Sequence, residues 1–141
     1  MTLNSIAFQR CISPECGATF SPENVLVSCP TCGDLLDIDY EWDRLKVPKQ
    51  LSDFESYWAD RYLPHRFSGV WRFHELLPFV APEDIVTIGE GQTLLQRAER
   101  VANDVGVASK NLYLQYEGMN PSGSFKDNGM TAAFTHARAT G

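Results

Sequence analysis

The sequence lacks the long apolar runs that mark membrane proteins. Nowhere in its 141 residues do about eighteen apolar residues follow one another, the length that a membrane-spanning helix needs. Residues 1–10 contain no apolar stretch of signal-peptide length. We therefore expect a cytoplasmic protein with no membrane partner.

The sequence also lacks an excess of basic residues. Its 12 lysines and arginines face 18 aspartates and glutamates, which gives a formal net charge of -6, and the two signs are interspersed. Without a basic stripe little can neutralise a phosphate backbone, so nucleic acid is not an expected partner. The 43% of hydrophobic and 21% of charged residues, with no low-complexity tract, are typical of a globular chain that buries a core.

Cysteine is absent beyond the first 32 residues. The four cysteines form two close pairs, Cys11 with Cys16 and Cys29 with Cys32. Two such pairs can provide the four thiolates of a tetrahedral zinc site, and the glycine that follows each pair, Gly17 or Gly33, would let the backbone turn toward the metal. We interpret residues 1–38 as a zinc-ribbon-like module. The zinc would be structural, because four protein ligands leave no open coordination position for catalysis.

Two other interpretations of the cysteines stay open. The thiols can pair as disulfides, which the absence of a secretion signal disfavours, or stay buried without metal in the relic of a ribbon. The first pair also encloses four residues, 12–15, where two are usual in zinc sites.

Residues 39–80 are expected to form a connector and an N-terminal helical segment. Apolar and aromatic residues recur at spacings of three and four between residues 51 and 62, which predicts an amphipathic helix. The stretch 68–78 is too short to assign by periodicity, and we expect a short helix or turn that Trp71 and Phe73 dock onto the rest of the chain.

Residues 81–141 alternate between helical and strand patterns, which favours an α/β fold. Thr93 and Gln96 have the spacing of a capping box and predict a helix over residues 94–105. Alternating apolar residues predict a strand over residues 112–116, followed by a loop.

The last predicted helix begins at Ser124, with Asp127 completing a capping box. Its expected buried face has the helical spacing i, i+3, i+4 and i+7 and consists of Met130, Ala133, Phe134 and Ala137. A parallel sheet begun here could hardly be completed within the chain, so we expect a truncated domain.

The loop before this helix contains the most informative residue, Lys126. Small residues around Pro121 bring the backbone close to any bound group, and Lys126 follows in the first helical turn. There the positive end of the helix dipole favours the neutral amine that attacks an aldehyde, as a Schiff-base lysine must. From the residues alone, a solvated surface lysine is the more common case at such a position, and the Schiff base is the less common one.

Two motifs carry a resemblance to a known family. Residues 120–127, Asn-Pro-Ser-Gly-Ser-Phe-Lys-Asp, are very similar to the signature of fold-type II enzymes that use pyridoxal phosphate (PLP). Residues 89–94, Gly-Glu-Gly-Gln-Thr-Leu, resemble the Gly-Glu-Gly-x-Thr-Pro element of threonine synthases. Residues 112–118 and 68–73 look like further segments of that family, so the resemblance covers nearly the whole chain.

The resemblance implies that residues 81–141 begin a fold-type II PLP-dependent α/β domain. Lys126 would carry PLP, and Phe125 would pack near its ring. The complete enzyme would convert O-phosphohomoserine and water into threonine and phosphate, with a possible homodimer at full length. These 141 residues alone are expected to be inactive.

The sequence departs from the family pattern at three positions, with Leu94 in place of proline, Gln115 of lysine and Asn128 of arginine. These departures leave the subfamily open. The alternatives are a cysteate synthase, a serine or threonine dehydratase and an O-phosphoserine sulfhydrylase. A non-catalytic zinc-ribbon binding module is the alternative from another class.

Overall fold

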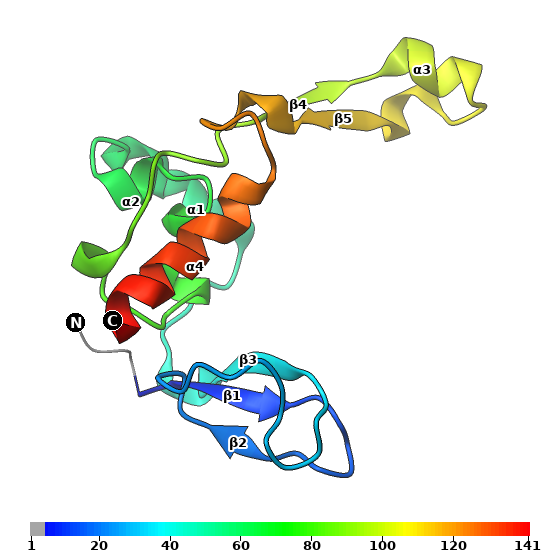
Figure 1. The fold of residues 1–141 in the computed structure, drawn as a ribbon. Helices are drawn as coiled ribbons and strands as arrows, with labels where there is room; N and C mark the ends of the chain where they lie inside the picture. Colours follow the sequence, from blue (N-terminus) through cyan, green and yellow to red (C-terminus); the bar gives the residue numbers. More distant parts are fainter. Residues whose placement is uncertain (1–4) are drawn as a thin grey trace.

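The N-terminal part of the chain is a three-stranded antiparallel sheet with the order β2-β1-β3 (Figure 1). The computed structural model describes residues 5–141. The strands are β1 (Ala7–Cys11), β2 (Thr19–Phe20) and β3 (Leu36–Tyr40). On the central strand, Gln9 lies opposite both Phe20 and Ile38. The buried side-chain amide of Gln9 donates to the backbone carbonyls of Ser21 and Asn24. These bonds hold the loop that follows β2 against the sheet.

Short helices make up the middle of the chain. They are η1 (Trp42–Arg44), α1 (Leu51–Glu55), η2 (Ser56–Asp60), α2 (Pro64–Phe67), η3 (Trp71–Leu76) and η4 (Pro82–Asp84). The helix predicted over residues 51–62 is therefore α-helical only in its first part and continues as a 3₁₀ helix. A capping box between Gln50 and Asp53 starts it, and Phe54 is its buried residue.

The core gathers around Trp71, whose side chain is fully buried against Ala7, Phe79 and Val80. The indole N–H of Trp71 donates to the hydroxyl of Thr131 at 2.8 Å. The expectation that Trp71 docks the stretch 68–78 is confirmed. Because Ala7 belongs to β1, this core also joins the N-terminal sheet to the rest of the chain.

The helix predicted over residues 94–105 is wrong in its first half. Leu94–Arg97 form strand β4, which pairs antiparallel with β5 (Tyr113–Tyr116), and only Glu99–Asp104 are helical, as α3. Helix η5 (Ser109–Asn111) completes the connection, and Figure 1 shows the hairpin projecting from the helices with α3 at its far end. Backbone pairing with a distant strand has outweighed the local spacing of apolar residues.

The last elements are η6 (Glu117–Met119) and the long helix α4 (Lys126–Thr140). The predicted apolar face of α4 is not the buried one, since Met130 is 46% and Phe134 57% exposed. The buried face carries Asp127, Thr131 and Thr135 instead.

Hydrogen bonds explain why α4 buries polar side chains. The hydroxyl of Thr131 donates to the carbonyl of Val86, and the hydroxyl of Thr135 accepts from the Val86 amide. Such bonds remove most of the cost of burying a hydroxyl. At its far end α4 reaches the N-terminal module, where His136 contacts the Pro22 carbonyl at 2.8 Å. The α/β class is confirmed, and no helix within residues 5–141 is long and apolar enough to cross a membrane.

Candidate functional site

The four cysteines meet at one end of the N-terminal sheet. Their sulfur atoms all lie within 4.8 Å of one another, and none forms a disulfide. The Sγ atoms of Cys11 and Cys32 are 3.4 Å apart, and those of Cys16 and Cys29 are 3.8 Å apart. A tetrahedral zinc with Zn–S bonds of about 2.3 Å separates its sulfurs by about 3.8 Å. The donor set therefore fits a four-thiolate zinc site.

Two tight backbone turns bring the cysteines together. Gly17 and Gly33 both adopt positive φ, at 57° and 85°, as expected for glycines that follow each pair. The amide of Gly33 donates to the carbonyl of Cys29 at 2.8 Å, which closes the second turn. The first turn is closed in the same way, by the Gly17 amide on the Ser13 carbonyl at 3.0 Å.

The thiols differ in acidity because their surroundings differ. Burial raises the pKa of the Cys11 thiol to about 12. Burial also works to raise the pKa of Cys29, but the backbone amides of Cys32 and Thr31 and the neighbouring thiols lower it to about 6. A bound cation would favour the thiolate form of all four.

The second candidate site is the loop that precedes α4. As predicted, Lys126 lies in the first helical turn, and its side chain is exposed. Within residues 5–141 the amine of Lys126 makes no hydrogen bond or ion pair. Phe125, the N-cap residue of α4, is 63% exposed. Both side chains are thus available to a ligand.

The carboxylate of Asp127 binds Ser122 and so closes the loop that carries Lys126; we call this contact the carboxylate clasp. The buried side chain of Asp127 accepts hydrogen bonds from both the amide of Ser122, at 2.8 Å, and its hydroxyl. The predicted capping box between Ser124 and Asp127 is therefore wrong. Helix α4 begins at Lys126 with Phe125 as its N-cap, and the carboxylate of Asp127 binds Ser122. Ser124 contributes more weakly, with its hydroxyl accepting from the Lys126 amide at 3.2 Å.

The segment 89–94 lies against the lysine loop and is anchored by a buried carboxylate. Glu90 is fully buried, and it accepts from the hydroxyl of Ser68, from the hydroxyl of Thr87 at 2.8 Å and from the amide of Ile88 at 3.1 Å. Three donors satisfy the charge, as a buried carboxylate requires. The two family motifs and the segment 68–73 thus form one structure.

Asn120 connects that anchored segment to the lysine loop. Its buried side chain accepts from the amide of Gly91 at 2.7 Å and donates to the carboxylate of Glu117 at 2.8 Å. Gly91 in turn packs directly against Gly69. A Cβ added to Gly69 would lie only 2.7 Å from the Cα of Gly91. The close approach explains the need for glycine at both positions.

The carboxylate of Glu117 accepts hydrogen bonds from the side-chain amides of three residues in different parts of the chain. Gln115 donates to its carboxylate at 2.6 Å and Asn128 at 3.2 Å, in addition to Asn120. Two of the three departures from the family pattern, Gln115 and Asn128, therefore meet at one carboxylate. Sequence reasoning did not identify Glu117 or Glu90, because neither has a sequence spacing that signals these long-range contacts.

The lysine loop is open at Gly123. Gly123 adopts a φ of 75°, and a Cβ placed there would meet no atom within 4 Å. The loop thus leaves open space beside a free primary amine and an exposed aromatic ring. These are the groups that covalent attachment of an aldehyde cofactor needs, and they fit PLP.

Comparison with known proteins gives a consistent result. The chain is 39% identical over 132 residues to the threonine synthase of Methanosarcina acetivorans, covering 94% of the chain and 28% of that relative. It is 38% identical over 133 residues to the threonine synthase of Methanocaldococcus jannaschii, covering 94% and 29%. Identity with the threonine synthase of Mycobacterium leprae is 48% over 56 residues, which are 40% of the chain and 15% of the relative. No family model matches the chain.

The chain thus has homologues at 38–39% identity along nearly its whole length, and it corresponds to their N-terminal part. It spans less than a third of their length.

Proposed function

We propose that this chain is the N-terminal part of a threonine synthase in which Lys126 carries PLP. The observation that supports this most is the free amine of Lys126, which projects from the first turn of α4, in a loop that the carboxylate clasp closes and that Asn120 joins to the anchored segment 89–94. In this proposal residues 1–38 form the zinc-ribbon-like module and residues 81–141 begin the PLP-dependent domain. Residues 39–80 connect them.

The residues of the chain have distinct roles in the proposed reaction. PLP, when bound, supplies an electron sink for the charge that develops at the substrate α carbon. Lys126 would hold the cofactor through its amine and, when that amine is free, would remove the α proton as a general base. Phe125 would pack near the cofactor ring. Asp127 does no chemistry and fixes the loop through Ser122, so that the amine keeps its position.

The substrate proposed for the complete enzyme is O-phosphohomoserine, with threonine and phosphate as products. The zinc bound by the four cysteines would stabilise the N-terminal module and take no part in this reaction, since all four of its positions are filled by thiolates. Light scattering on the complete enzyme tests the expected homodimer.

A chimera tests the proposed function. This chain replaces the matching N-terminal part of the Methanosarcina acetivorans relative, and phosphate release from O-phosphohomoserine is measured. We expect activity in the chimera, none after Lys126→Ala and full activity after Lys110→Ala. A folded chimera that binds PLP but releases phosphate only from another substrate would contradict the assignment and favour one of the related PLP enzymes.

A further inference from the structure

One side chain, that of Glu117, binds the chain on both sides of Lys126. Its Oε2 atom accepts hydrogen bonds from the side-chain amides of Asn120, at 2.8 Å, and of Asn128, at 3.2 Å. Asn120 precedes Lys126 by six residues, and Asn128 follows it by two, in the first part of α4. A single carboxylate oxygen thus connects the beginning of the lysine loop to the helix that follows it.

Further contacts fix the beginning of the loop. Asn120 is buried, and its side-chain amide also donates to the backbone carbonyl of Glu117 at 3.0 Å. The backbone carbonyl of Asn120 accepts from the amide of Gly123 at 2.8 Å and so forms the turn of the loop. The other carboxylate oxygen of Glu117, Oε1, accepts from the side-chain amide of Gln115 at 2.6 Å. Because Gln115 belongs to β5, the same carboxylate also ties the loop to this strand.

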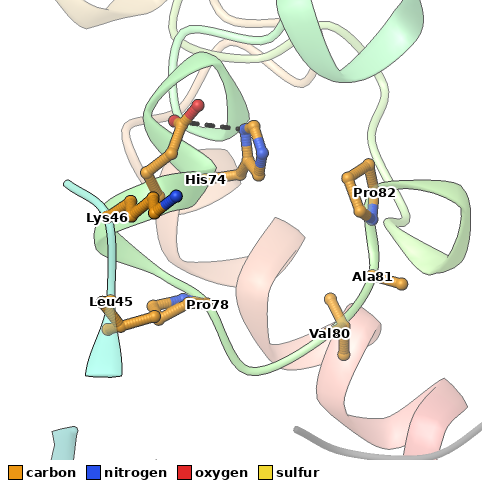
Figure 2. A pocket seen from close by; sticks show the side chains of 8 residues that line it. Leu45, Lys46, His74, Pro78, Val80, Ala81 and Pro82 are labelled. Carbon is orange, nitrogen blue, oxygen red and sulfur yellow. Dashed lines mark ion pairs between the residues drawn. The ribbon is translucent and has the colours of Figure 1, made fainter. Parts of the chain in front are cut away.

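The partners of Glu117 are neutral amides. Within residues 5–141 no lysine or arginine forms an ion pair with this carboxylate. Glu75, another half-buried glutamate, differs in this respect, because the Arg66 guanidinium lies 3.4 Å from it. Figure 2 shows the contact of Glu75 with His74 as a dashed line. The charge of Glu117 thus acts on the amides alone, and hydrogen bonds to a charged acceptor are stronger than neutral ones.

We propose that Glu117 is a positioning residue for Lys126 and acts through the two asparagines that it binds on either side. The inference rests on the proposed function, in which the amine of Lys126 is the group that has to be held in place. Asp127 closes the loop from within, whereas Glu117 fixes its two ends to each other and to β5. Glu117 itself touches neither cofactor nor substrate and performs no chemistry.

Position 128 separates the effect of charge from that of shape. The family pattern has arginine there, and a cation beside Glu117 would keep the contact that Asn128 makes through its amide. Aspartate has nearly the shape of asparagine, but it would place a second negative charge at this contact, and like charges repel. Shape alone would favour Asn128→Asp over Asn128→Arg, whereas the proposal predicts the reverse order.

Hydrogen exchange of the chain itself tests whether Glu117 holds the loop. In Glu117→Gln the asparagine amides lose their charged acceptor, so the hydrogen-bonded backbone amides of Ser122 and Gly123 should exchange about tenfold faster relative to those of β1. Glu75→Gln, the matched control at a glutamate outside this network, should leave that ratio unchanged. An unchanged ratio in Glu117→Gln would overturn the proposal, whichever reaction the complete protein catalyses.

Labelling of the chimera with PLP tests the position of the amine. After borohydride reduction, the adduct at Lys126 is compared with that at Lys110 in the same molecule. We expect Glu117→Gln and Asn128→Asp each to lower the Lys126 adduct about tenfold and Asn128→Arg to preserve it, with Asn103→Asp on the exposed surface of α3 as the control. Equal labelling in Asn128→Asp and Asn128→Arg would refute the positioning role. An unlabelled Lys126 in the unsubstituted chimera would instead contradict the proposed function, and hydrogen exchange would then decide the role of Glu117.

Discussion

The carboxylate of Asp127 accepts two hydrogen bonds from Ser122, one from the backbone amide at 2.8 Å and one from the hydroxyl. Lys126 lies between these two residues in sequence, so the clasp holds the loop from which its amine projects. The geometry of the candidate site therefore depends on a residue that performs no chemistry.

Replacement of Asp127 by asparagine should destabilise the chain by about 1–3 kcal/mol, because one donor of Ser122 then loses its charged acceptor. Urea denaturation followed by circular dichroism measures the change. Asp104→Asn is the control, since the Asp104 side chain makes no hydrogen bond or ion pair within residues 5–141. Equal stability of the two variants would show that the clasp contributes nothing.

Two glycine substitutions should have opposite effects. In Gly69→Ala the new methyl group would overlap the backbone of Gly91, and overpacking of this kind costs about 1–3 kcal/mol. In Gly129→Ala, on the exposed side of α4, it would meet nothing within 4 Å and should stabilise the helix by about 0.5–1 kcal/mol. Melting temperatures compare the two. A similar shift of the melting temperature in both variants would show that close packing at Gly69 is not what determines the effect of Gly69→Ala.

The replacement Thr135→Val keeps the shape of a fully buried side chain but removes its hydroxyl. The amide of Val86 then loses its acceptor, at a cost of about 1–3 kcal/mol. Thr140→Val, near the end of the same helix, should change stability little, because its hydroxyl only adds to helix carbonyls. Chemical denaturation distinguishes the variants, and a neutral Thr135→Val would mean that α4 does not depend on this contact.

The cysteine cluster should bind one zinc per chain, measured by elemental analysis after dialysis. A chelator should lower the melting temperature, because a structural metal stabilises only the folded state. Zinc affinity should fall as the pH is lowered, since protons then compete for the thiolates. Cys16→Ser should lose most of the zinc, with Ser13→Ala as the control for the same turn. Full zinc retention in Cys16→Ser would contradict the four-thiolate site.

The parts of the site that the sequence could predict are the local ones. The spacing of the cysteines predicted their cluster, and the loop before α4 predicted the position of Lys126 in the first helical turn. In both cases neighbouring residues determine the geometry, through glycine turns and a helix start.

The remaining features depend on contacts between distant residues. Leu94 and its neighbours have helical spacing but pair with β5, and the apolar residue Phe134 stays exposed while Thr135 is buried. Glu117 gains its importance only when Gln115, Asn120 and Asn128 fold around it. No local pattern of apolar residues contains that information.

Covalent labelling tests the central claim most directly. The chimera described above is incubated with PLP, reduced with borohydride and digested, and the modified lysine is located by mass spectrometry. We predict that Lys126 carries the label and that the other lysines, Lys46, Lys49 and Lys110, do not. A folded chimera in which Lys126 remains unlabelled, or is labelled no more than the others, would contradict the assignment of this chain to a PLP enzyme.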